Sequence, residues 1–200
     1  MFYPTVVRGV TLYEGLLRID EDLSAREQAK GCPHCGGPLD SSPWQRHPRG
    51  VEAAKAVVWW RLGLCCRRED CRKRVLPPSV LFLGRRWYWA AVVLVSVASR
   101  QRRTVGATAT ALRRMFGVCR ATLARWLAFF ATDFPSSAPW RALRGRVSAE
   151  VRDDALPAAL LAQFDRLVGP GEAALVACLT FLASAVGPGF VREVSHAQNL

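Results

Sequence analysis

Residues 32–37 read CPHCGG and residues 65–74 read CCRREDCRKR, and these two stretches decide how the region between them folds. In the first stretch, two cysteines separated by two residues can place both sulfurs on one side of a tight turn. The glycine that follows lets backbone N–H groups face the thiolates. The second stretch supplies another cysteine pair. Four thiolates complete a tetrahedral site, so the spacing predicts one zinc ion held by Cys32, Cys35, Cys66 and Cys71.

The third ligand is a choice between Cys65 and Cys66, because neighbouring side chains on a strand point to opposite faces. We favour Cys66, since its shorter gap to Cys71 is nearer to a knuckle turn. His34 and His47 are alternative ligands, and a set of buried free thiols is the alternative for the whole cluster. A metal with four protein ligands has no open position for water or substrate, so this site is expected to be structural.

The cysteines lie in a stretch rich in Cys, Pro and Gly, whose strand-like segments, 56–62 and 80–83, are short. Apolar residues recur at helical spacing on both sides of it. The sequence therefore predicts a mainly α fold with a small β zinc ribbon, a trihelical core and C-terminal helices. The expected order is an N-terminal helical segment (1–30, with its helix over 11–29), the ribbon (31–84), a helix-turn-helix domain (85–134) and a C-terminal helical segment (135–200, with helices over 139–147, 157–168 and 171–186).

Residues 104–130 read TVGATATALRRMFGVCRATLARWLAFF and predict a helix-turn-helix. Apolar residues stand at helical spacing on both sides of a turn at Gly117, and Cys119 occupies the N-cap of the second helix. An apolar helix over 87–98 is expected to complete the trihelical core. The alternative is a helical hairpin that only packs, with its arginines in solvent.

The charge of the chain favours nucleic acid as the partner. There are 28 Lys plus Arg against 16 Asp plus Glu, which gives a formal net charge of +12. A field of this sign attracts polyanions, and the N-terminal end of the second helix is the part that enters a major groove in this motif. The residues expected to contact DNA are Arg120, Thr122 and Arg125 toward the bases, and Arg72, Arg74, Arg102, Arg103, Arg113 and Arg114 toward phosphates.

Several other classes of protein are not expected. The apolar stretches are shorter than the roughly 18 to 20 residues that span a bilayer, and residues 1–10 lack the apolar core of a signal peptide. We therefore expect a cytoplasmic protein, in which seven cysteines favour metal binding over disulfides. Only three histidines are present, no glycine-rich phosphate loop precedes a lysine, and Cys119 and Cys178 stand in apolar contexts. The chain is not expected to be an enzyme.

The order CPHCGG, CCRREDCRKR, PPSVLFLGRR and TATALRRMFGVCRATLARW resembles the zinc-ribbon plus helix-turn-helix N-terminal part of bacterial insertion-sequence transposases. It is also similar to small stand-alone proteins encoded beside such elements, and this likeness implies a bacterial, nucleoid-associated protein. The resemblance covers roughly residues 31–134, and it implies the same four zinc ligands and the same base-reading residues, Arg120, Thr122 and Arg125. It departs after Phe134, because residues 135–200 are too few for the catalytic domain of such transposases. Cleavage and strand transfer are therefore not expected.

The leading expectation is a zinc-containing, double-stranded DNA-binding protein that serves a mobile element as an accessory or regulatory factor. A transposase or recombinase is a further candidate partner, and a homodimer is the candidate assembly. The alternative is an adaptor that docks a transposase, recombinase or polymerase subunit, with the apolar helix over 173–186 either as docking surface or as part of the core. A third hypothesis is an RNA-binding module that uses the ribbon aromatics Trp44, Trp59 and Trp60.

Overall fold

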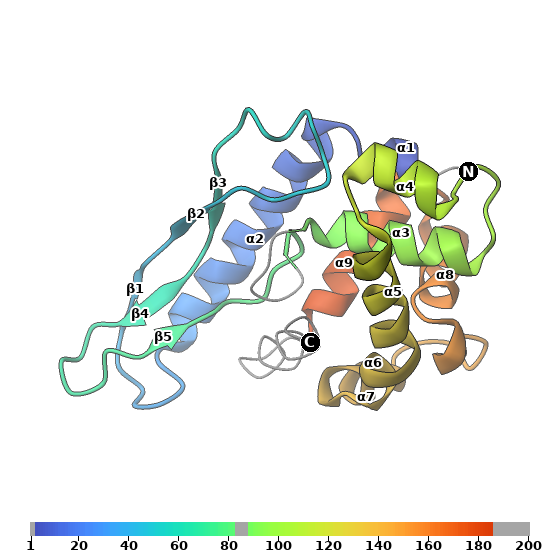
Figure 1. Cartoon of the computed structure of the whole chain (residues 1–200). Coiled ribbons are helices and arrows are strands. Elements are labelled where there is room, and N and C mark those ends of the chain that lie inside the picture. The colour runs from blue at the N-terminus through green and yellow to red at the C-terminus, as the bar shows by residue number, and fades with distance from the viewer. Residues whose placement is uncertain (1–2, 83–87, 186–200) are drawn as a thin grey trace.

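The computed structural model describes residues 3–82 and 88–185 of the chain. A long helix flanked by a ribbon of short strands forms one side of the molecule, and a group of helices forms the other (Figure 1). The fold is mainly α with a small antiparallel β part, which confirms that part of the prediction. Some predictions lie outside the described residues. These are the ends of predicted elements at residues 83, 87 and 186, and the segment 187–200.

The β part consists of short antiparallel strands in two sheets. One sheet has the order β1-β4-β5 and the other pairs β2 with β3. Leu39 lies opposite Cys66 in the first sheet, and Trp44 lies opposite Arg61 in the second. The strands are β1 (Leu39–Ser41), β2 (Trp44–Arg46), β3 (Trp59–Arg61), β4 (Leu64–Cys66) and β5 (Arg74–Val75).

We call residues 31–76 the ribbon. Its end that carries the paired cysteines, residues 31–42 and 62–76, is the ribbon tip, and residues 47–58 are the ribbon loop. The ribbon extends along α2 (Val10–Lys30), with the tip near the C-terminal end of this helix and the ribbon loop near its start (Figure 1). Gly31 ends α2 with a φ of 77°, a conformation that suits glycine, and the chain then turns into the first cysteine pair.

The remaining helices form one group around α3. No helix among the described residues combines the length and the apolar character needed to cross a bilayer. Besides α2, the helices are α1 (Tyr3–Val6), α3 (Ala90–Gln101), α4 (Ala109–Phe116), α5 (Arg120–Ala128), the π-helical turn η1 (Phe129–Asp133), α6 (Phe134–Ser136), α7 (Ala138–Arg144), the 3-10 turn η2 (Asp153–Ala155), α8 (Ala158–Val168) and α9 (Glu172–Ala183).

The helix α3 lies at the centre of the main core. Every residue from 90 to 99 is buried, so the helix has no solvent-facing side over this length. It contacts α4 and α5, which also contact each other, and it contacts α8 and α9 on another side. The apolar residues of α9, among them Leu175, Cys178 and Leu179, are buried in this same core. They close the core, and so they do not form the docking surface that was one of their two expected roles.

An aromatic cluster joins the ribbon and α2 to the main core. Trp89, directly before α3, lies 4.2 Å from Tyr13 of α2 and 4.8 Å from Trp59 of β3, measured between ring centroids. Phe82 stacks on Trp89 at 5.6 Å. The ribbon tip has a separate, smaller cluster made of Cys32, Leu39, Leu64, Cys66 and Val75.

Candidate metal centre and basic helical surface

The ribbon tip brings the four predicted ligands together. The sulfurs of Cys32, Cys35, Cys66 and Cys71 all lie within 4.8 Å of one another. Cys32 Sγ lies 3.8 Å from Cys71 Sγ, and Cys35 Sγ lies 3.5 Å from Cys66 Sγ, so none of these pairs is a disulfide. A tetrahedron of sulfurs around zinc, with bonds of about 2.3 Å, has edges of about 3.8 Å. The cluster can therefore hold a metal ion.

The first cysteine pair folds as a tight turn. The Gly36 N–H donates to the Cys32 carbonyl at 2.8 Å, and the Cys32 N–H donates to the Gly37 carbonyl at 2.8 Å. Gly36 has a φ of 70°, which glycine adopts without strain. A Cβ at Gly37 would lie 2.6 Å from Cδ of Arg68, so glycine also permits the close approach of the two halves of the tip.

The second cysteine pair, with four residues between its members, closes in a similar way. The N–H groups of Cys71 and Arg72 both donate to the Arg68 carbonyl, at 3.0 and 2.9 Å, and form the turn that returns Cys71 to the cluster. Arg72 has a φ of 43°. In each cysteine pair, the residue that follows the last cysteine, Gly36 or Arg72, therefore has a left-handed backbone conformation. The Cys66 N–H donates to the Lys73 carbonyl at 2.9 Å and holds β4 beside the start of β5.

Backbone N–H groups point at the sulfurs. Burial opposes ionisation of Cys32, but hydrogen bonds from the N–H groups of His34 and Cys35, together with those from the thiols of Cys71 and Cys35, outweigh it and lower the pKa of Cys32 to about 7. For Cys66, burial raises the pKa to about 12, and the N–H of Arg68 acts against this rise. Donors aimed at sulfur favour thiolates, which is the form that binds metal.

Opposing effects also act on the pKa of the Cys71 thiol. The N–H of Lys73 favours its thiolate, but burial and the neighbouring sulfurs of Cys35 and Cys32 together raise its pKa. Negative charge on four sulfurs this close together is unfavourable unless a cation lies between them. The donor set and the electrostatics therefore both suit a metal ion better than four free thiols.

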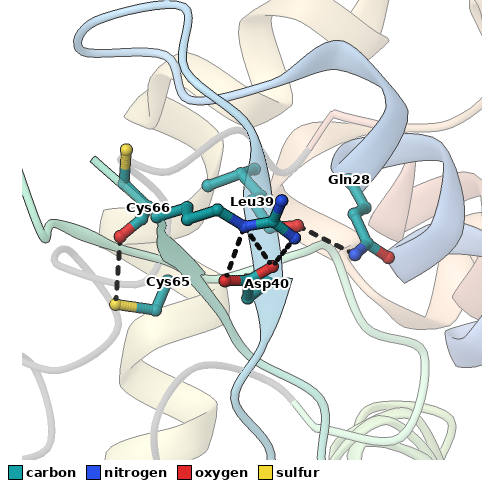
Figure 2. Close-up of polar contacts among 6 residues, drawn as sticks. Gln28, Leu39, Asp40, Cys65 and Cys66 are labelled. Atoms are coloured by element: carbon teal, nitrogen blue, oxygen red, sulfur yellow. Dashed lines mark hydrogen bonds and ion pairs between the residues drawn. The ribbon is translucent and has the colours of Figure 1, made fainter.

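Cys65 is not part of the cluster. Its side chain leaves β4 in a different direction from that of Cys66, and its thiol donates to the Cys66 carbonyl at 3.7 Å (Figure 2). The same thiol also donates to the Arg72 carbonyl at 3.6 Å. This is the expected alternation along a strand. Within the described part of the chain, the cluster includes neither His34 nor His47, and both of these side chains are exposed.

Two contacts that the spacing of the cysteines does not reveal position the tip. Gln28 of α2 donates from Nε2 to the Leu39 carbonyl at 2.9 Å, which fastens β1 to the helix (Figure 2). Arg67 donates from Nε and Nη2 to the Asp40 carboxylate, with a shortest distance of 2.6 Å, and links β1 to the residue after β4. Both residues of this pair are largely exposed, so it adds little stability and chiefly fixes geometry.

The cations of the ribbon tip are partly neutralised. Arg68 pairs with Asp70 at 3.3 Å, and Arg72, a predicted phosphate contact, pairs with Glu69 at 3.6 Å. Arg74, the other predicted contact, is exposed on β5 and forms no ion pair with the described residues. Of the two, Arg74 is the better placed to meet a phosphate.

The predicted pair of helices around Gly117 is α4 and α5. The N–H of Gly117 donates to the Arg113 carbonyl at 2.8 Å, and its φ of 64° ends α4 in a left-handed cap. Val118 is 1% exposed and seals the turn against the core. Thr108 caps the start of α4 by accepting a hydrogen bond from the Ala111 N–H at 3.1 Å. The buried faces of the pair carry Leu112, Phe116, Leu123 and Trp126.

The outward residues of this pair form a basic surface. Arg113 and Arg114 on α4 and Arg120 and Arg125 on α5 are all exposed. Arg125 Nη2 donates to the Thr122 hydroxyl at 3.2 Å, so Thr122 orients this arginine.

Cys119 was expected to stand in an apolar context that keeps its thiol inert, and this expectation is wrong. Its side chain is exposed, and its sulfur lies 3.2 Å from the hydroxyl oxygen of Thr122. Hydrogen bonds from the side chain and backbone of Thr122 lower the pKa of this thiol.

The structure does not bring all predicted contacts to this surface. Arg102 donates to the Ala158 carbonyl at 2.8 Å and pairs with Asp165 at 3.3 Å, so its guanidinium holds α3 against α8. Arg103 is exposed beyond the end of α3, with a φ of 48°. Arg72 and Arg74 lie on the ribbon side of the molecule, across from α4 (Figure 1).

A comparison of the chain with protein-family models, with curated proteins and with solved structures finds no match. The resemblance to insertion-sequence transposases therefore stays a prediction.

Proposed function

We propose that this is a double-stranded DNA-binding protein with one structural zinc ion, and that it serves a bacterial mobile element as an accessory or regulatory factor. The observation that carries the proposal is the basic surface of α4 and α5. Between Asp70 and Asp133 the chain has no acidic residue but twelve lysines and arginines. Neither α4 nor α5 carries a carboxylate, and their exposed arginines form no ion pair with the residues that the structure describes, so a polyanion can supply the missing charge.

The proposed contacts follow from the positions on the two helices. The N-terminal end of α5 enters the major groove, where Arg120 and Arg125 meet base edges and Thr122 holds Arg125 in place. Arg113, Arg114 and Arg103 meet phosphates. Arg102 has no part in the interface, because its guanidinium is bound to α8.

Zinc is the proposed metal because, among the described residues, the site offers four sulfurs and no other donor. Such a set favours tetrahedral zinc, and it leaves no coordination position for a reaction. The role is stabilisation of the ribbon tip, whose own core contains only three aliphatic side chains, Leu39, Leu64 and Val75. Sheets of two- and three-residue strands do not hold themselves together.

The test is metal content together with a duplex-binding titration at two salt concentrations. We expect one zinc per chain and a log affinity that falls steeply with log salt concentration. Arg120→Ala and Arg125→Ala should relax sequence preference, whereas Arg113→Ala should weaken all duplexes about equally. Arg141→Ala, an exposed arginine on α7, is the matched control. Zinc without duplex binding, or equal effects of all four variants, contradicts the proposal.

A second candidate function, a protein-interaction adaptor, is favoured by exposed apolar side chains on the ribbon. Val57, Val58 and Trp60 are 41%, 51% and 41% exposed. Neighbouring apolar side chains exposed to this degree are typical of a surface that meets another protein. A co-purifying protein that is lost in Val58→Ser and Trp60→Ser, with no affinity of the wild type for duplex DNA, would replace the first proposal by this one.

A further inference from the structure

A basic pocket of about 800 Å³ lies between the ribbon loop and α4. Three separate segments bring cations to it. Arg8 comes from the link between α1 and α2, Arg49 and Lys55 come from the ribbon loop, and Arg114 comes from α4. Glu52 is the one carboxylate among the residues that line it.

The fold holds the ribbon loop firmly in this position. Arg49 forms a backbone bridge with Tyr88, two residues before α3. Gly50 has a φ of 115°, and a Cβ there would lie 3.1 Å from the Val92 side chain, so the loop backbone packs directly on α3. Val51 and Ala54 are buried in the main core at 3% and 1% exposure. The backbone that carries Arg49 and Lys55 is therefore held beside the pocket by packing.

The charge in the pocket is not balanced. Glu52 pairs with Lys55 at 2.6 Å. Arg8, Arg49 and Arg114 form no ion pair with any residue that the structure describes. Three guanidinium groups around one cavity repel each other unless an anion lies among them, so the pocket favours a negatively charged occupant.

The other lining residues indicate which part of a nucleic acid fits. They are small or aliphatic, apart from Met115 and from Phe116, which is only 2% exposed. A nucleobase thus finds no exposed ring to stack on among the described lining residues, whereas phosphate oxygens find three guanidinium groups. The lining also includes Gly117, the turn between α4 and α5. The pocket is therefore continuous with the basic surface proposed above.

We propose that this pocket binds the sugar-phosphate backbone of the duplex whose major groove receives α5. The inference rests on the proposed function and extends it, because it makes the ribbon loop a second element that holds the same DNA. Arg49 and Arg114 contact phosphates from the two sides of the pocket. The negative charge of Glu52 weakens the attraction of these arginines for phosphate.

The test measures duplex affinity as a function of salt for two ribbon-loop variants that leave α4 and α5 intact. Arg49→Gln should weaken binding to all duplexes several-fold and reduce the slope of log affinity against log salt by about one. Glu52→Gln should strengthen binding, because it removes the only negative charge among the described residues that line the pocket. A gain of affinity cannot come from misfolding, so this variant keeps the inference testable if Arg49→Gln is unstable. Arg141→Gln is the charge-matched control on α7 and should bind as the wild type does.

The outcomes separate the two proposals. If the wild type binds duplex DNA and Arg120→Ala weakens it, but both ribbon-loop variants bind normally, the pocket inference alone is overturned. If the wild type binds no duplex, both proposals are overturned together. Titration with deoxyadenosine monophosphate gives a third arm. Tight binding of this nucleotide that depends on Arg49, without any effect of Arg49→Gln on duplex affinity, assigns the pocket to a small phosphorylated ligand and overturns the inference.

Discussion

Asp20 is a carboxylate in the interior, between α2 and the segment that leads to α3. It is 1% exposed, and it accepts hydrogen bonds from the Ser79 hydroxyl and, at 2.6 Å, from the Val80 N–H. Burial raises its pKa from 3.8 to about 6, although these hydrogen bonds and the charge of buried Arg61 act in the opposite direction. Arg61 in turn donates to the Pro77 carbonyl at 2.6 Å.

The raised pKa of Asp20 predicts a pH-dependent stability. Because the folded protein binds this proton more tightly than the unfolded chain, the contribution to stability is full below pH 3.8 and is lost as the pH rises through 6. Asp20→Asn should therefore become more stable relative to the wild type between pH 4.5 and 7, by about 2 kcal/mol. Urea unfolding across this range measures the difference. Glu21→Gln, an exposed neighbour, is the control, and a constant difference between Asp20→Asn and wild type would show that Asp20 keeps an ordinary pKa.

The adjacent residues Cys65 and Cys66 should differ sharply in metal binding. Cys66 Sγ belongs to the cluster of four sulfurs, whereas the Cys65 thiol donates to backbone carbonyls. Cys65→Ser should keep one zinc per chain after dialysis against a weak chelator, and Cys66→Ser should lose most of it. Inductively coupled plasma emission spectrometry measures the zinc retained per chain. Retention of zinc by Cys66→Ser would mean that Cys65 can replace it as the third ligand.

At the scale of the elements, the ribbon tip should unfold by itself when its metal is removed. Its cluster, Cys32, Leu39, Leu64, Cys66 and Val75, is separate from the main core. With a strong chelator, amide hydrogens of 31–42 and 62–76 should exchange rapidly, while those of α3 keep their protection. Hydrogen exchange with mass spectrometry distinguishes the two regions. Simultaneous loss of protection in α3 would show that the tip and the helical core unfold as one unit.

The helices were the most predictable elements, because their signal is local. The periodicity predicted a helix over 11–29, where α2 is Val10–Lys30, and one over 157–168, where α8 is Ala158–Val168. The predicted end of the helix at residue 98 was too early, since α3 continues to Gln101. The side chain of Gln101 bonds the Leu156 carbonyl at 2.6 Å and the Ala158 N–H at 3.2 Å, and a contact over such a sequence separation leaves no local pattern.

The difference between local patterns and contacts over a large sequence separation also separates the two candidate sites. The cysteine set was predictable, because spacing within each pair determines which sulfurs face one another. The basic pocket was not, because Arg8, Arg49 and Arg114 come together only once α1, the ribbon loop and α4 have packed on α3. Arg102 is the opposite case, because it was predicted to contact DNA and the packing of the helices places it elsewhere. It looked like its exposed neighbour Arg103 in sequence, but its bond to Ala158 depends on where α8 lies.

At the scale of the whole molecule, Trp59 connects the ribbon, α2 and the segment before α3. It is 1% exposed, contacts both Tyr13 and Trp89, and donates from its indole N–H to the Ala54 carbonyl at 2.8 Å. Trp59→Ala should lower the free energy of unfolding by about 3–5 kcal/mol. Trp60→Ala, next to it on the same strand but 41% exposed, should change it little. Guanidinium unfolding compares the two, and similar losses in both variants would contradict the assigned role of Trp59.

The complete burial of α3 has a consequence for how the chain tolerates change. A helix at the surface accepts polar substitutions on its outer face, so tolerant and intolerant positions alternate with the helical repeat. Residues 90–99 have no outer face. In a library of single variants, these ten positions should form one unbroken block in which every charged substitution lowers the yield of folded protein, and accumulated variation should be confined there to exchanges among small apolar residues.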